Sequence, residues 1–161
     1  MGLDIVAISK IEKTSDEDGY RIGMDDPFER YELEPGFYIE SKESSSHHFR
    51  AGSYSGYNNW RSILSQSIYN VEPTEVWENR EEYQKRPFYE LIWFSDCEGS
   101  FGPKISEKLY GDFVSHEERF KKFLEANFDG DNFMIERYFS VYEDFKNGFK
   151  IASEGGSLIF S

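Results

Sequence analysis

The last third of the chain carries a regular stripe of large, mostly aromatic side chains. Its members are Met134, Tyr138, Val141, Tyr142, Phe145 and Phe149. Their spacing of three and four residues is the period of one face of an α-helix. We therefore predict a long helix over 132–151. An aromatic face of this kind belongs to the core of a folded domain and not to a cofactor site.

The composition indicates a folded, acidic protein. Aromatic residues make up 18% of the chain, whereas disordered acidic chains are poor in them. Acidic residues outnumber basic ones by 31 to 18, and the net charge of -13 disfavours binding to a nucleic-acid backbone or an anionic membrane surface. The single cysteine, Cys97, excludes an intrachain disulfide. We expect no signal peptide and no membrane span, and hence a cytoplasmic protein.

Five short stretches predict β-strands, because each alternates or is apolar throughout. They cover residues 3–9, 36–40, 47–54, 88–94 and 158–160. The stretch 88–94 is the most apolar and predicts a buried strand. A hairpin between 36–40 and 47–54 is the simplest pairing. Residues 10–35 show little periodicity, and we expect loops there with a helix start at Asp26-Pro27.

Helices are predicted to begin near Gly56, at Pro73 and at Gly102-Pro103. The first has Ser55 or Asn58 as its expected N-cap. The second lies in a candidate lid or insertion over 70–87, and the third is expected to bend near Gly111 before a capping box at Ser115 starts a new helix. Strands and helices that do not alternate strictly imply a single α+β domain over 1–161. Its small mixed or antiparallel sheet would pack with three to four helices.

The stretch 49–61 has the composition of a recognition loop, and 95–99 is its expected counterpart in a ligand site. Glycine allows close backbone approach, hydroxyls and amides form directed hydrogen bonds, and arginine binds anions. The candidate ligand-binding residues are Arg50, Ser53, Tyr54, Ser55, Tyr57, Asn58, Arg61, Asp96 and Glu98.

These residues favour a phosphorylated or nucleotide-derived ligand. Arg50 and Arg61 would hold phosphate with help from backbone N–H groups. Tyr54 or Tyr57 would stack on a base, and the two carboxylates would take ribose hydroxyls or an exocyclic amine. The alternative for Arg50 is a structural salt bridge with Asp96 or Glu98. A binding protein of this kind needs no cofactor.

An enzyme is the second hypothesis. Asp4, Asp96 and Glu98 could ligate Mg²⁺ or Mn²⁺ in a phosphoesterase or nuclease. The chain has no histidine or cysteine spacing typical of zinc sites, and the adjacent His47 and His48 would point to opposite faces of a strand.

Covalent catalysis is disfavoured. In the stretch 52–56, tyrosine stands where a nucleophile elbow has its serine. Two neighbouring carboxylates disfavour a Cys97 thiolate. A third hypothesis is an acidic inhibitor that fills the basic groove of a host enzyme. The sequence is compatible with a homo-oligomer and with binding to a protein partner.

The chain also resembles a family of uncharacterised bacterial and bacteriophage proteins. The motifs that carry the resemblance are Phe49–Asn58 (FRAGSYSGYN) and Phe94–Gly99 (FSDCEG) followed by Gly102-Pro103, with shorter matches at both ends of the chain. Phe101 departs from the pattern, where a small aliphatic residue is usual. The resemblance implies a single domain from a bacterium or an infected host cell and no particular reaction. It suggests that the protein could sequester a signal during conflict between phage and host.

Overall fold

The first strand lies inside a four-stranded antiparallel sheet. The computed structural model describes residues 2–23, 32–94 and 98–161. Across the sheet the strands are β5 (Ser46–Ser53), β1 (Gly2–Ile8), β7 (Ser157–Phe160) and β6 (Gly99–Phe101). Leu3, Ile5 and Ala7 of β1 are fully buried. The strands predicted over 3–9 and 158–160 are therefore confirmed, and the apolar pattern of the first fits a strand with neighbours on both sides.

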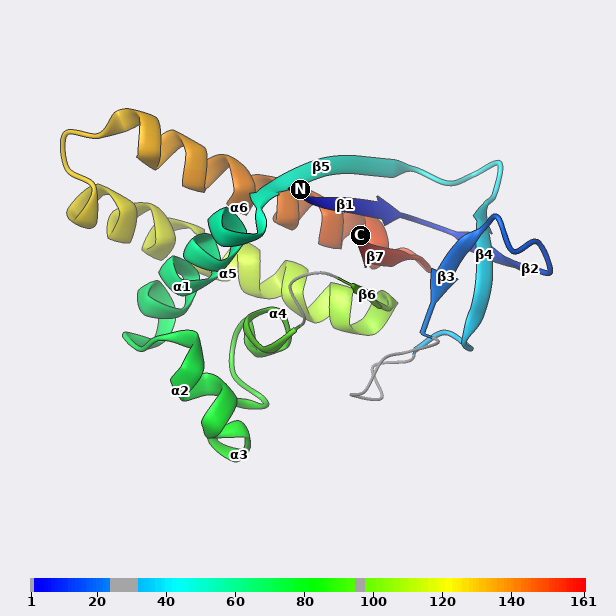
Figure 1. Cartoon of the computed structure of the whole chain (residues 1–161), viewed down its shortest axis with the longest axis horizontal. Coiled ribbons are helices and arrows are strands. Elements are labelled where there is room, and N and C mark those ends of the chain that lie inside the picture. The colour runs from blue at the N-terminus through cyan, green and yellow to red at the C-terminus, as the bar shows by residue number, and fades with distance from the viewer. Residues whose placement is uncertain (1, 24–31, 95–97) are drawn as a thin grey trace.

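A second, three-stranded antiparallel sheet lies beside the first (Figure 1). Its strands, in order, are β2 (Ile11–Thr14), β4 (Gly36–Glu40) and β3 (Tyr20–Ile22). The predicted hairpin of 36–40 with 47–54 is wrong, because β5 instead pairs with the whole length of β1. The true partners of β4 come from the stretch that we expected to be loops. They are only four and three residues long and contain one buried residue, Ile22, so they show too little apolar alternation to predict a strand.

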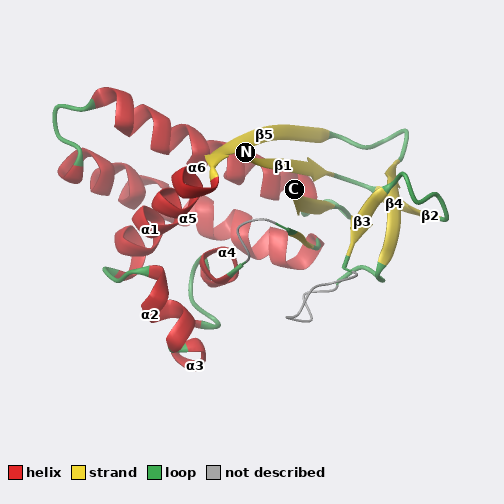
Figure 2. Cartoon of the chain, viewed as in Figure 1, coloured by secondary structure: helices red, strands yellow, loops and turns green. Residues whose placement is uncertain are grey.

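Two long helices, α5 (Pro103–Asn127) and α6 (Asn132–Ala152), form a hairpin that extends beyond the four-stranded sheet (Figure 2). The predicted helix over 132–151 is confirmed, and α6 packs on the sheet. At Gly148 a Cβ atom would lie 3.0 Å from Leu158 Cδ1 and 3.5 Å from the Ala7 Cβ. The helix therefore makes its close approach to the sheet at a residue without a side chain.

Two predicted elements differ from the structure. The stretch 88–94 contains a short helix, α4 (Tyr89–Trp93), and not a strand. Phe88, just before it, has a φ of 61° and donates its N–H to Asp112 Oδ2 at 3.0 Å. An apolar run of this length does not distinguish a buried strand from a buried helix. The predicted bend is also wrong, because α5 continues through Gly111 and Ser115, and one glycine is tolerated inside a helix.

Three further helices complete the described part of the chain: α1 (Tyr54–Tyr69), α2 (Pro73–Glu78) and α3 (Arg80–Tyr83). The protein is a single α+β domain with two antiparallel sheets, as the sequence predicted for its class. The described residues contain six helices where we expected three to four, because α2, α3 and α4 are only four to six residues long. None of the helices described is long and apolar enough to cross a bilayer.

The buried Tyr142 of α6 predicts loss of stability at alkaline pH. Burial raises the pKa of its hydroxyl above the ordinary value of 10, and the carboxylates of Glu117 and Asp112 raise it further. The hydroxyl donates to the Phe113 carbonyl at 2.6 Å. The folded protein holds this proton more tightly than the unfolded chain does. The contribution of the Tyr142 hydroxyl to the free energy of unfolding is therefore intact below pH 10 and falls as pH rises toward the folded pKa.

Urea unfolding between pH 8 and pH 11 measures this effect. Above about pH 10 the free energy of unfolding should fall, and each such tyrosine contributes up to about 1.4 kcal/mol per pH unit. Tyr142→Phe should reduce the slope, while Tyr69, whose pKa burial also raises, supplies a remaining part. An unchanged slope in Tyr142→Phe would contradict the assignment.

Candidate functional site

The recognition stretch forms the end of β5 and the first turns of α1. Ser53 is the N-cap of α1, and its Oγ accepts the Gly56 N–H at 3.1 Å. The Ser55 hydroxyl lies 3.1 Å from the same oxygen. The expected caps, Ser55 and Asn58, are therefore replaced by Ser53. Ser53 therefore caps the helix, and Ser55 contacts the capping hydroxyl.

The two tyrosines of this stretch face the protein interior. Tyr57 is fully buried and stacks on Trp60, with ring centroids 6.1 Å apart. Tyr54 is half-buried against the hydrophobic core. A base could not stack on Tyr57 without displacing core side chains, so its role in the structure is packing.

Arg50 lies on β5 and pairs with the neighbouring strand. Its Nε atom is 3.6 Å from Asp4 Oδ1, and the two side chains remain 61% and 63% exposed. The ion pair is therefore formed with Asp4, whereas the alternative considered for Arg50 was a salt bridge with Asp96 or Glu98. Exposed pairs of this kind contribute little to stability. Arg50 lies on β5 and Arg61 on α1, and the pocket lined by Arg61 does not include Arg50 among its lining residues.

The acidic residues of the metal hypothesis are only partly described. Asp96 and Cys97 lie outside the described residues. Glu98 is exposed and directly precedes β6, while Asp4 lies on β1, with β7 between the two strands. Within 2–23, 32–94 and 98–161 no group of three or more His, Cys, Asp or Glu could hold a metal ion. The site formed by Asp4, Asp96 and Glu98 therefore stays a prediction.

Arg61 is the most unusual charged residue of the predicted set. Only 6% of its surface is exposed. Nη1 donates to the Phe94 carbonyl at 2.6 Å and Nη2 to Asn58 Oδ1 at 2.5 Å. Both acceptors are neutral, and none of the ion pairs between described residues includes Arg61. Its Nε–H is buried and has no hydrogen-bond acceptor among the described residues.

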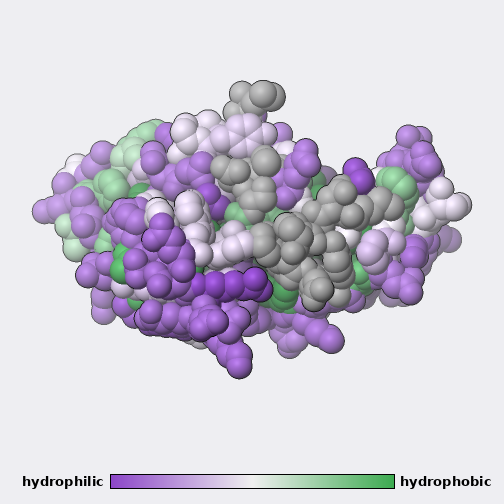
Figure 3. Space-filling model, turned by 60° about the horizontal axis from the view of Figure 1, so that its bottom comes forward, coloured by the Kyte–Doolittle hydropathy of each residue, from purple (hydrophilic) through white to green (hydrophobic). Residues whose placement is uncertain are grey.

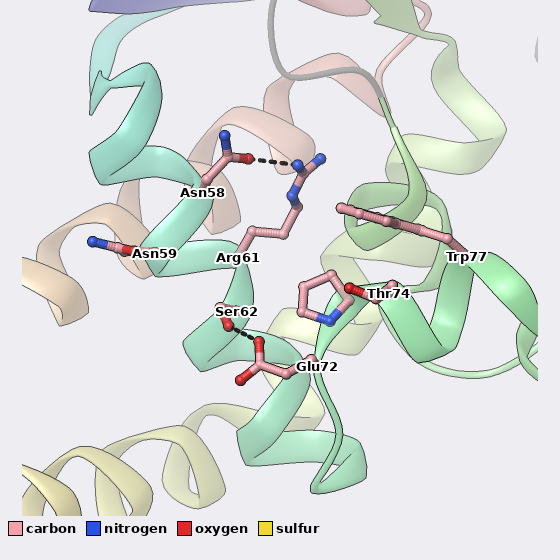
Figure 4. A pocket seen from close by; sticks show the side chains of 8 residues that line it. Asn58, Asn59, Arg61, Ser62, Glu72, Thr74 and Trp77 are labelled. Carbon is pink, nitrogen blue, oxygen red and sulfur yellow. Dashed lines mark hydrogen bonds between the residues drawn. The ribbon is translucent and has the colours of Figure 1, made fainter.

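This guanidinium lines an open pocket of about 340 Å³ between α1 and α2 (Figure 4). The lining residues are Asn58, Asn59, Arg61, Ser62, Glu72, Pro73, Thr74 and Trp77. The volume is in the range of small-molecule sites. Most of the lining side chains can form hydrogen bonds, and Arg61 is the one positively charged residue among them. The structure thus brings Arg61 and Asn58 of the predicted set to one pocket and leaves Arg50 elsewhere.

Trp77 forms the aromatic wall of the pocket. The Arg61 Cζ atom lies 5.3 Å from the Trp77 ring centroid and 5.5 Å from that of Tyr57. The indole N–H of Trp77 donates to the Ile92 carbonyl at 3.0 Å, which fixes the ring although 41% of the residue is exposed. A fixed, partly exposed tryptophan beside a buried cation can bind a flat ring.

The sequence did not indicate the contribution of α2 to this candidate site. The predicted site residues did not include Asn59, Ser62, Glu72, Thr74 or Trp77. The proline at position 73 opens the helix, and Val76 anchors it in the core. Trp77 follows the anchor directly and so points to a different side. The position of Trp77 directly after the core residue Val76 was the feature of the sequence that could have indicated an exposed aromatic side chain here.

The N-terminus of α5 is capped by an acidic side chain that the sequence did not indicate. Glu32 accepts the backbone N–H of Lys104 and that of Ile105, the latter at 2.5 Å. Because the carboxylate satisfies two otherwise unpaired donors, Glu32→Ala should lower the free energy of unfolding by about 1 kcal/mol. Urea denaturation checks this, with Glu17→Ala in an exposed turn as the control. Equal midpoints for both variants would refute the capping role.

Figure 3 shows the face of the molecule that lies at the bottom of Figure 1. This face is largely hydrophilic, with scattered hydrophobic residues. Among the described residues, the exposed large hydrophobic side chains are Ile39, Trp77, Val114 and Phe133, which lie on four different elements. Of these four, Trp77 lines the pocket between α1 and α2.

Comparisons of the chain with protein-family models, curated proteins and solved structures found no match. The resemblance to bacterial and bacteriophage proteins therefore stays a prediction.

Proposed function

We propose that the protein binds a small phosphorylated or nucleotide-derived molecule in the pocket between α1 and α2. The observation that carries the proposal is the buried Arg61, whose described partners are a carbonyl and an amide. A buried charge is costly unless a counter-charge or sufficient hydrogen bonds compensate it. An anionic ligand in the pocket would supply the counter-charge.

The other walls of the pocket suit the remainder of a nucleotide. Trp77 offers a fixed ring surface for a base, and Thr74 supplies a hydroxyl close by (Figure 4). Binding requires only these groups, so no catalytic step is part of the proposal. A role in sequestering a signal during conflict between phage and bacterium is supported by the sequence resemblance alone.

A thermal-shift screen of nucleotides, cyclic dinucleotides, ADP-ribose-type molecules and divalent metal ions tests the proposal. A ligand at 100 times its dissociation constant stabilises the folded protein by about 2.7 kcal/mol. Trp77→Leu should reduce the shift, because it removes the ring wall. The matched controls Arg50→Ala and Arg137→Ala remove exposed arginines outside the pocket and should leave the shift unchanged.

The other outcomes discriminate between the remaining hypotheses. Loss of the shift in Arg50→Ala but not in Trp77→Leu would move the site to β5 and overturn the pocket assignment. A shift by metal ions alone would favour the phosphoesterase hypothesis. A chain that responds to none of the compounds would contradict ligand binding, and capture of a basic host protein would then favour the inhibitor hypothesis.

A further inference from the structure

Glu72 places a carboxylate in the same pocket as Arg61. It is the residue that precedes α2, and its side chain reaches back to α1 (Figure 4). The Ser62 hydroxyl donates to one carboxylate oxygen and the Gln66 amide to the other. The carboxylate is thereby held in one orientation at the pocket wall, although Glu72 remains exposed to solvent.

We infer that Glu72 binds the vicinal hydroxyls of a ribose, so that the pocket selects ribonucleotides over their deoxygenated counterparts. This inference rests on the proposed function of the pocket. An ionised carboxylate accepts about four hydrogen bonds, and Glu72 receives one at each oxygen from Ser62 and Gln66. The remaining capacity matches two adjacent hydroxyl donors. Because the carboxylate is already oriented, binding would cost little side-chain entropy.

Arg61 and Glu72 together give the pocket a polarity that restricts its ligands. The ligand must present an anion or acceptor to the guanidinium and donors to the carboxylate. Inorganic phosphate meets only the first requirement, and a free nucleobase lacks the anion. A second phosphate placed near Glu72 would be repelled. A nucleoside monophosphate carries the phosphate, the diol and the flat base on one scaffold, and the pocket of about 340 Å³ is of the size that small-molecule ligands occupy.

A purely structural role for Glu72 makes a different prediction. If its carboxylate served only to tie α2 to α1, neutralising it would change stability and weaken all ligands alike. Selectivity between two ligands that differ only in the ribose hydroxyls would then be unaffected. The substitution Glu72→Gln keeps the size of the side chain and an acceptor for Ser62, so it separates the two roles.

The experiment compares binding of the four ribonucleoside 5′-monophosphates and their 2′,3′-dideoxy counterparts to the wild-type protein and to Glu72→Gln. Wild type should bind the ribonucleotide about tenfold more tightly than its dideoxy form, the order expected for charge-assisted hydrogen bonds. Glu72→Gln should lose this preference and bind the dideoxy form at least as well as wild type does.

Equal affinities for both forms in wild type, or a preserved preference in Glu72→Gln, would overturn the role of Glu72 while leaving ligand binding intact. Failure of the wild-type protein to bind either form, with binding of some other nucleotide-derived compound in the screen, would likewise reject the ribose assignment alone. Failure to bind any of the compounds would reject the proposed function, and the inference with it.

Discussion

Gly156→Ala is expected to destabilise the protein by about 3 kcal/mol or more. Gly156 follows α6 and directly precedes β7. A Cβ atom at this position would lie 1.7 Å from the Ile8 carbonyl oxygen and 2.8 Å from the Ser9 Cα. Both are backbone atoms at the end of the central strand, so neither can rotate away. The added methyl group would force β7 away from β1 at the end of their pairing.

Urea unfolding of Gly156→Ala measures this effect, and the chain contains a matched control. Gly111 lies inside α5, and a Cβ there would meet no atom within 4 Å. Gly111→Ala should therefore raise the free energy of unfolding by about 0.5 to 1 kcal/mol, because alanine favours the helix. Gly156→Ala with wild-type stability would show that the α6–β7 connection is placed differently.

Phe145→Ala is expected to lower the free energy of unfolding by about 3 to 5 kcal/mol. Phe145 of α6 is fully buried and lies at the centre of the aromatic core. Its ring centroid is 4.9 Å from that of Trp60 and 5.0 Å from that of Phe49, which belong to α1 and β5. Its removal would leave a cavity where three elements meet, in addition to the loss of buried apolar surface.

Phe133→Ala is the matched control for this prediction. It removes the same side chain from the same helix, but Phe133 is 71% exposed. Its effect should remain within about 0.5 kcal/mol. Similar losses for the two variants in urea unfolding would contradict the burial pattern of α6 and the position of the core.

The sequence predicted the helices whose apolar residues recur with the clearest helical period. It did not predict the strand pairing or the backbone conformations that depend on contacts between distant residues. Helix α6 shows three aromatic residues on one buried face, so its spacing alone was sufficient. The pairing of β4 was not predictable, because β2 and β3 are only four and three residues long and contain a single buried residue. The conformation of Phe88 depends on a hydrogen bond to Asp112, which lies on another helix. No local pattern records such a contact.

Only some of the residues that line the candidate pocket could be identified from the sequence. Composition singled out the stretch that contains Arg61 and Asn58, and both line the pocket. The burial of Arg61 depends on the Phe94 carbonyl, which is 33 residues away in the chain. The contributions of Trp77 and Glu72 depend on how α2 packs beside α1. These are long-range relationships, and only the folded structure reveals them.

Calorimetric titration of a nucleotide from the screen into wild type and into Arg61→Gln tests the central claim most directly. Wild type should bind one ligand per chain, and Arg61→Gln should lose at least about 100-fold in affinity, because a buried charged hydrogen-bond partner is removed. Circular dichroism and urea unfolding would establish that this variant is folded. Equal affinity of a folded Arg61→Gln would contradict the assignment of Arg61 as the anion-binding group of this protein.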